Sequence, residues 1–355
     1  MYLYDVQSGN LNHISNHEGN VNFNPSSFSV DSKSLYFLTD KDSEFKYLQK
    51  YIIADGTIIE IQKEEWDIWY SYFSHSGRYR VTGINADSQT EIEVFDYEKN
   101  RPVRLPQLPA GSISSVSISK SEKYMALYHG SAKSPSDLYL LDVESKKYQK
   151  LTNAMNPDVN PEYLGNAKVI RFKSFDGLEI PAVYYKPPNA SSKNRVPAIV
   201  KVHGGPGGQA RVGYRASTQY LVNHGYAVLD INNRGSNGYG KTFQTLDDQA
   251  HGEGDLDDCV WAMNWLKKQK HVDGDKIGIL GGSYGGYMVM AALAFRPDAF
   301  DVGVNLFGVT NWVRTLKSIP PWWEAMRESL YKEMGNPHTQ EAYLYSISPL
   351  FHAEN

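Results

Sequence analysis

The segment Ile279–Gly286, with the sequence ILGGSYGG, joins a short apolar stretch to the start of a helical pattern. It contains Gly-x-Ser-x-Gly, with Ser283 between Gly281 and Gly285. This pattern exposes a serine hydroxyl when it forms a strand, a sharp turn and a helix, and glycines flank the serine because the strained turn leaves no room for side chains. We therefore predict that Ser283 is a catalytic nucleophile and that Gly281 and Gly285 form its elbow. The alternative is a glycine-rich turn with no catalytic role.

Short apolar stretches alternate with helical patterns on both sides of this segment, from about residue 160 onward. Continuous apolar strands separated by helices indicate a mostly parallel sheet that is covered on both faces. An alternating pair of strands precedes them, and we expect Asp176-Gly177 to join that pair as a two-residue hairpin turn. The predicted elements are strands at 169–175, 178–185, 196–202, 226–231, 276–280 and 302–306, a helix at 255–270 and a second helix beginning near Tyr284.

A second glycine-rich segment, Val202–Gly208 with the sequence VHGGPGG, follows one of these strands. Acyl transfer needs two N–H donors aimed at the developing oxyanion. The residue after the nucleophile supplies one, here Tyr284, and the loop after an earlier strand supplies the other, here Gly205 or Gly204. His203 precedes Ser283, whereas in this type of site the base follows the serine, so we expect His203 to be a structural hydrogen-bonding residue.

The segment Gly235–Thr242 matches the phosphate-loop pattern G-x-x-x-x-G-K-T. That loop binds phosphate only where strand, loop and helix follow one another without interruption. Here three residues intervene after the predicted strand, and Asp247 and Asp248 follow, where carboxylates would oppose a bound triphosphate. We therefore treat nucleotide binding as the weaker interpretation of this segment.

The first 155 residues form an internal repeat. Similar units open at Phe28, Phe73 and Ile118, 45 residues apart, and each closes with an apolar run that ends in an aspartate turn. Such a period with several short strands per unit is typical of β-propeller blades. An antiparallel sandwich with accidental spacing is the alternative.

The repeat provides about three blades, whereas a propeller closes with roughly four to eight. Tyr4-Asp5-Val6 matches only the closing strand of a blade, so the chain is expected to begin within one. We predict a partial β-propeller over residues 1–158 and an α/β-hydrolase domain over 159–355 that lacks its last strands.

Three motifs in order, Val202–Pro206, Asn233–Gly240 and Gly281–Gly286, resemble those of the prolyl oligopeptidase family of serine peptidases, most closely its acylaminoacyl-peptidase-like branch. The resemblance is dense from about residue 160 and only architectural before it. It implies that Ser283 is the nucleophile, that the N–H groups of Tyr284 and Gly205 form the oxyanion hole, and that the substrates are short peptides, since the family's propeller screens out folded proteins.

The resemblance also implies an aspartate and a histidine after the serine, and here the sequence departs from the family. After Ser283 the candidate acids are Asp298 and Asp301, which lie before or at the start of the next predicted strand, and the candidate bases are His338 and His352. None of them stands in a segment that matches the family's pattern. We therefore expect the triad Asp and His beyond residue 355, in a longer peptidase of which this chain is an internal fragment. A serine without its base is a poor nucleophile, so these 355 residues alone should hydrolyse peptides only slowly.

Composition excludes several other classes of function. The net charge of −4 lacks the basic excess of a nucleic-acid binder, and no apolar run approaches a membrane span. The single cysteine, Cys259, excludes a disulfide framework and a multi-cysteine metal site, so we expect no metal and no cofactor. We predict a cytoplasmic location, with a periplasmic or secreted one as the alternative if a signal peptide precedes Met1.

Specificity is less accessible from the sequence. Trp322 and Trp323 are candidates for a substrate pocket, although buried packing is the favoured interpretation of both. Two other functions stay open: an esterase with the same nucleophile and oxyanion hole, and a non-catalytic interaction module. Exposed edge strands invite pairing, so a homo-oligomer is a further outcome that the sequence leaves open.

Overall fold

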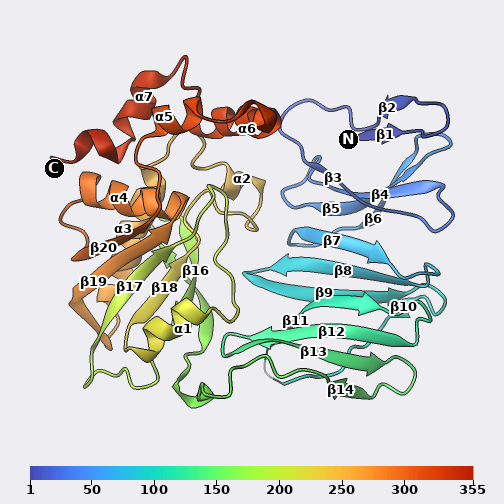
Figure 1. Ribbon diagram of the computed structural model, residues 1–355, viewed down its shortest axis with the longest axis horizontal. Coiled ribbons are helices and arrows are strands. Elements are labelled where there is room, and N and C mark those ends of the chain that lie inside the picture. The colour runs from blue at the N-terminus through green and yellow to red at the C-terminus, as the bar shows by residue number, and fades with distance from the viewer. Residues whose placement is uncertain (110, 355) are drawn as a thin grey trace. The chain divides into compact units, whose positions relative to one another are not determined.

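The computed structural model describes residues 1–109 and 111–354, which divide into two compact units (Figure 1). Unit 1 comprises Met1–Asn156 with Gly238–Lys241, and unit 2 comprises Pro157–Asn237 with Thr242–Asn355. No helix of the described residues combines the length and the apolar character that a membrane span requires.

Unit 1 contains three antiparallel sheets of four strands, and in each the strands follow one another in chain order. This is the arrangement of propeller blades, as the sequence predicted. A two-stranded hairpin of β1 (Tyr2–Tyr4) and β2 (Leu11–His13) precedes them. The blades are β3 (Phe23–Phe28), β4 (Ser34–Thr39), β5 (Tyr47–Ile52) and β6 (Ile58–Gln62); β7 (Ile68–Phe73), β8 (Tyr79–Ala86), β9 (Gln89–Asp96) and β10 (Arg101–Pro102); and β11 (Ser112–Ile118), β12 (Tyr124–Ser131), β13 (Ser134–Asp142) and β14 (Tyr148–Lys150).

A serine turn repeats at the same place in all three blades, between the first and second strands. Ser29, Ser74 and Ser119 each donate a backbone N–H to the residue five positions on and accept that residue's N–H on the side-chain oxygen, at 2.8–3.1 Å. A serine hydroxyl satisfies backbone groups that a tight turn would otherwise leave unpaired. The 45-residue sequence period therefore corresponds to one repeated hydrogen-bonded turn.

The aspartate turn that closes each sequence unit also has a structural counterpart. At Asp5 and Asp142 the carboxylate accepts the backbone N–H of the serine three residues on, at 2.6 and 2.8 Å. Asp142 is the last residue of the third strand of its blade, and Asp5 directly follows β1. The hairpin β1–β2 is thus equivalent to the last two strands of a blade, whereas the sequence predicted only a closing strand there.

Unit 2 is built on one six-stranded sheet, with the order β15-β16-β18-β17-β19-β20 (Figure 1). Strands β18, β17, β19 and β20 run parallel, and β15 and β16 are antiparallel to their neighbours. The α/β-hydrolase expectation is therefore confirmed as a mixed sheet. The strands are β15 (Ala167–Lys173), β16 (Glu179–Tyr185), β17 (Val196–Val202), β18 (Ala227–Ile231), β19 (Val272–Gly282) and β20 (Val302–Leu306).

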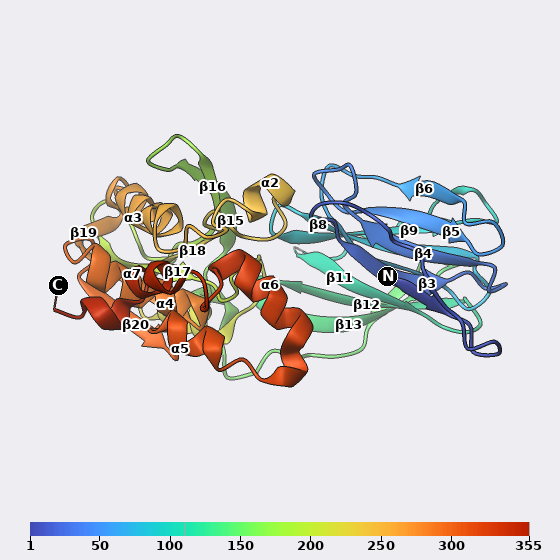
Figure 2. The same ribbon diagram turned by 90° about the horizontal axis from the view of Figure 1, so that it is seen from above.

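The main core of unit 2 lies between this sheet and two of its helices, α3 (Gly254–Lys267) and α4 (Tyr284–Phe295), which contact the sheet and each other (Figure 2). Helix α4 is apolar nearly all round, which suits a helix buried on most sides. The remaining helices are α1 (Ala216–Asn223), α2 (Lys241–Gln244), α5 (Trp312–Lys317), α6 (Glu324–Met334) and α7 (Glu341–Ser346), with 3-10 turns η1 (Pro161–Tyr163), η2 (Pro321–Trp323) and η3 (Pro349–His352).

The hairpin between β15 and β16 differs from the prediction. Lys173 pairs with Glu179, so the connection has five residues and not the two of Asp176-Gly177. Gly177 donates its N–H to Ser174 and has a φ of 87°. A four-residue turn followed by a glycine in the left-handed region is a common longer hairpin connection, and the dipeptide alone does not distinguish the two.

Candidate active site at the β19–α4 turn

Ser283 stands between β19 and α4 with a φ of 56° and a ψ of −119°. A residue with a Cβ adopts a positive φ only when its surroundings impose it. Here Ser283 donates its N–H to Leu306 at 3.1 Å and its carbonyl accepts the N–H of Tyr287 at 3.0 Å. The side chain is exposed and does not cap the helix that follows. The hydroxyl is therefore presented to solvent at a strained turn.

The two glycines of the motif are required by close backbone contacts. A Cβ placed on Gly281 would lie 2.2 Å from the carbonyl oxygen of Gly285, and one placed on Gly285 would lie 2.2 Å from the carbonyl oxygen of Val202. Strand β19, helix α4 and the end of β17 thus cross without room for side chains. This is the geometry that the sequence predicted for an elbow.

The loop after β17 passes beside Ser283. A Cβ on Gly204 would lie 3.5 Å from the Cβ of Ser283 and 4.0 Å from its Oγ. Gly205 has a φ of 150°, and a Cβ there would lie 2.7 Å from the backbone nitrogens of both Gly207 and Gly208. The structure thus brings the predicted glycine loop and the predicted nucleophile together.

His203 orients this loop. Its Nδ1 lies 2.8 Å from the carbonyl oxygen of Gly204, and its Nε2 lies 2.8 Å from Oγ of Ser236. Because the carbonyl and the following N–H of a planar trans peptide point in opposite directions, this contact also fixes the direction of the Gly205 N–H. Burial lowers the pKa of His203, which favours the neutral ring. His203 thus has the structural hydrogen-bonding role expected of it.

The other predicted donor is the backbone N–H of Tyr284. Tyr284 is the first residue of α4, and the first N–H groups of a helix have no acceptor within the helix. Such groups, together with the helix dipole, favour negative charge at this end. The described geometry can therefore offer N–H groups to an oxyanion near Ser283.

Arg234 holds the segment that carries Ser236. Its Nε and Nη2 donate to the two carboxylate oxygens of Asp258 at 3.0 and 2.9 Å, and its Nη1 lies 3.0 Å from Asp176. Asp258 is fully buried and also accepts from the hydroxyl of Ser174 at 2.5 Å. The Arg-Gly-Ser segment is thus fixed by a buried ion pair, and the helix after it, α2, has only four residues, which does not suit a phosphate loop.

Every histidine of unit 2 has a contact away from Ser283. No described imidazole or carboxylate is hydrogen-bonded to the Ser283 hydroxyl. The contacts are His203 with Ser236, His224 with the Tyr220 carbonyl, His251 with the Tyr284 hydroxyl, His271 with the Tyr184 hydroxyl, His338 with the Tyr331 ring and His352 with the Phe295 ring. A base for Ser283 is therefore not found among these contacts.

The two tryptophans predicted from the sequence differ from their favoured interpretation. Trp322 is 81% exposed and Trp323 is 49% exposed, and both lie in the 3-10 turn η2. Buried packing is therefore wrong for both. A pocket role for them stays a prediction.

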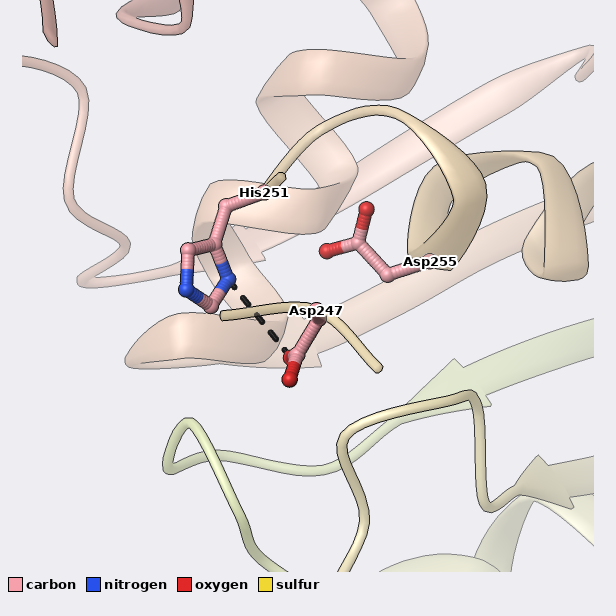
Figure 3. Close-up of side chains that lie close together, drawn as sticks. All are labelled: Asp247, His251 and Asp255. Carbon is pink, nitrogen blue, oxygen red and sulfur yellow. Dashed lines mark ion pairs between the residues drawn. The ribbon is translucent and has the colours of Figure 1, made fainter. Parts of the chain in front are cut away.

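A buried polar cluster under α4 was not predicted from the sequence. Asp247, His251 and Asp255 are each at most 1% exposed, and Figure 3 shows their side chains gathered in the segment that leads into α3. Burial raises the pKa of Asp247 to about 8 and that of Asp255 to about 6, and it lowers the pKa of His251 to about 4. The spacing of four residues between successive members is the only sequence signal for this cluster.

Comparison with known proteins assigns the segment that contains these motifs. Residues 212–355 match the family model described as "Prolyl oligopeptidase family". This segment is therefore similar to the prolyl oligopeptidase family, and the motif residues Gly281–Gly286 lie inside it.

Other known proteins are similar to nearly the whole chain. A dipeptidyl aminopeptidase BIII from Pseudoxanthomonas mexicana is 29% identical over 340 residues, which are 93% of this chain and 49% of that protein. A puromycin hydrolase structure has a TM-score of 0.83 at 18% identity, covering 98% of this chain and 54% of that one. An acylaminoacyl peptidase from Pyrococcus horikoshii has a TM-score of 0.74 at 23% identity, covering 100% and 54%. The chain thus spans about half the length of these relatives.

Proposed function

We propose that this protein is a serine-type peptidase that cleaves short peptides through an acyl-enzyme on Ser283. The observation that carries the proposal is the strained, exposed Ser283 at the start of α4, beside a glycine loop whose peptide is oriented by His203. A nucleophile next to preorganised N–H donors is the arrangement that acyl transfer requires. The similarity of residues 212–355 to the prolyl oligopeptidase family supports the same reaction.

Two kinds of short peptide are candidate substrates, and they differ at the amino terminus. The sequence motifs resemble the acylaminoacyl-peptidase-like branch, while a relative that covers most of the chain is named a dipeptidyl aminopeptidase. The first kind of enzyme acts on a blocked amino terminus and the second on a free one. We propose short peptides as the substrate class and the acylaminoacyl type as the first to test.

The test is covalent modification of Ser283. The purified chain is treated with a fluorophosphonate, and the modified peptide is identified by mass spectrometry, with Ser283→Ala as the control. We expect slow modification that is selective for Ser283, because N–H donors alone retain part of the catalysis when no base is present. Dissolved imidazole should raise the rate, since it supplies a base for the hydroxyl proton.

Substrates then separate the alternatives. Three chromogenic substrates are compared in the presence of imidazole: the amide of an acetylated amino acid, the amide of a dipeptide with a free amino terminus, and an ester. Faster amide than ester turnover relative to solution hydrolysis supports a peptidase, and the reverse supports an esterase. A chain whose Ser283 is modified no faster than its other exposed serines would contradict the proposal and favour a non-catalytic module, for which the absence of a described base is the supporting observation.

A further inference from the structure

The side chain of Tyr284, the residue after Ser283, ends in the buried polar cluster. Tyr284 is 2% exposed, and its hydroxyl lies 2.7 Å from Oδ2 of Asp255 and 2.6 Å from Nδ1 of His251. His251 precedes α3, whereas Asp255 lies in the first turn of α3 (Figure 3). The hydroxyl therefore connects the first turn of α4 to the first turn of α3.

A divalent cation is the other occupant that this cluster suggests. Asp247, His251 and Asp255 each offer a ligand atom, and these atoms lie within 4.8 Å of one another. However, the Tyr284 hydroxyl bridges two of the three, and Oδ1 of Asp255 already accepts the backbone N–H groups of Glu253 and Leu256 at 3.0 and 2.8 Å. A cation would have to displace these contacts, so the geometry favours a hydrogen-bond network.

The Tyr284 hydroxyl can bridge these two side chains because a tyrosine hydroxyl both donates one proton and accepts. The Glu333 carbonyl oxygen only accepts, so its 3.3 Å contact with His251 Nε2 is made by a ring that carries a proton on Nε2. In a neutral ring of this kind, Nδ1 accepts the Tyr284 proton; in a ring protonated on Nδ1, that nitrogen donates to the tyrosine oxygen and the hydroxyl donates to Asp255. In either arrangement the Tyr284 hydroxyl links His251 to Asp255.

We propose that His251 and Asp255 are positioning residues: by holding the Tyr284 hydroxyl, they fix the first turn of α4 and, with it, the Tyr284 N–H and the Ser283 hydroxyl. A strained residue such as Ser283 keeps its conformation only when the surrounding structure over-determines it. The backbone contacts of Ser283 with Leu306 and Tyr287 hold the turn itself, and the buried hydroxyl bridge holds the residue that follows Ser283. The catalytic consequence rests on the function proposed above, whereas the positioning itself can be measured without activity.

Four variants test the proposal. Tyr284→Phe removes the hydroxyl, His251→Leu removes the imidazole that it contacts, and His251→Asn restores a hydrogen-bonding group at the place of Nδ1. Tyr287→Phe is the matched control, because this tyrosine is equally buried on the same helix and its hydroxyl is not hydrogen-bonded to His251 or Asp255. Amide hydrogen exchange of a peptide covering residues 279–288 reports the conformation, and the rate of fluorophosphonate modification at Ser283 reports the chemistry.

We expect Tyr284→Phe and His251→Leu to speed exchange in this peptide by about tenfold, the effect of one lost buried hydrogen bond. His251→Asn should recover most of the loss, and Tyr287→Phe should stay within about twofold of the parent chain. Modification of Ser283 should slow in the same order. If the variants show these exchange differences but Ser283 of the parent chain is not modified, the positioning is supported and the proposed function is contradicted.

Two results would overturn the inference. The first is unchanged exchange in Tyr284→Phe, or an equal change in Tyr287→Phe, which would mean that packing and not the hydroxyl holds the turn. The second is a rise in melting temperature with Mn²⁺ or Zn²⁺ that Asp247→Asn abolishes, which would mean that the cluster binds a cation instead of the hydroxyl.

Discussion

Replacing Asp258 by asparagine tests the buried ion pair that holds the Arg-Gly-Ser segment. Asp258 is fully buried and accepts the side chain of Arg234 through two hydrogen bonds, the Arg234 backbone N–H at 2.9 Å and the Ser174 hydroxyl. Burial raises the pKa of Asp258 even though Arg234 opposes the shift. Asparagine has nearly the same shape, but it leaves the guanidinium without its buried counter-charge and turns an amide N–H group toward it.

The expected loss follows from this uncompensated charge. Removing one partner of a buried, hydrogen-bonded ion pair typically costs about 3–5 kcal/mol of unfolding free energy. For a unit of about 200 residues, 1 kcal/mol corresponds to about 2–4 °C in melting temperature, so unit 2 should melt roughly 6–20 °C lower. Differential scanning calorimetry of the parent chain and the Asp258→Asn variant measures this difference.

The same arginine provides the control. Asp176 pairs with its Nη1 at 3.0 Å, but the Asp176 side chain is 38% exposed, and an exposed pair contributes only about 0–1 kcal/mol. Asp176→Asn should therefore lower the melting temperature by no more than about 4 °C. If the two variants melt within 2 °C of each other, the argument that burial decides the strength of this ion pair is refuted.

Two further predictions concern the elbow and its surroundings. Gly205→Ala should slow fluorophosphonate modification of Ser283 by about 100-fold or more, because the new Cβ would displace a donor loop; Gly213→Ala, where a Cβ meets nothing within 4 Å, should leave the rate unchanged, and equal rates in both would contradict this role for the loop. Asp247→Asn should stabilise the chain increasingly as pH rises from 6 to 8. The pKa of Asp247 is raised to about 8 by burial and by the charges of Asp255, Glu333 and Asp248, so the stability that its bound proton provides is lost toward that pH, at about 1.4 kcal/mol per pH unit. A difference in melting temperature between the two chains that stays constant from pH 6 to pH 8 would contradict the raised pKa.

Two strands of the six-stranded sheet could be predicted closely from the sequence. Strands β17 and β20 have the predicted bounds, 196–202 and 302–306, because each is a short, largely apolar run set off by loop residues. The blades could be predicted for a different reason. Their serine and aspartate turns are local, so a turn that repeats in structure also repeats in sequence.

What the sequence could not predict depends on contacts between distant residues. The partners of the Tyr284 hydroxyl lie 29 and 33 residues away, and nothing at those positions resembles a motif. The exposure of Trp322 was missed because an apolar side chain is buried only where another element covers it, and neighbouring residues do not encode that cover. The length of the hairpin after Lys173 was missed because Asp-Gly occurs in two turn types.

The connectivity of the blades has a consequence for how the chain folds. Each blade of unit 1 pairs strands that follow one another directly, so nearly all of its ladders join residues that are close in sequence. In unit 2 the strand order is permuted, and β17 must pair with β19 across three helices and another strand. Short loops close at a low entropic cost, and chains rich in local contacts fold faster than chains that depend on distant pairings. Blade formation in unit 1 should therefore precede assembly of the central sheet, so that the turn carrying Ser283 is among the last parts of the chain to reach its final conformation.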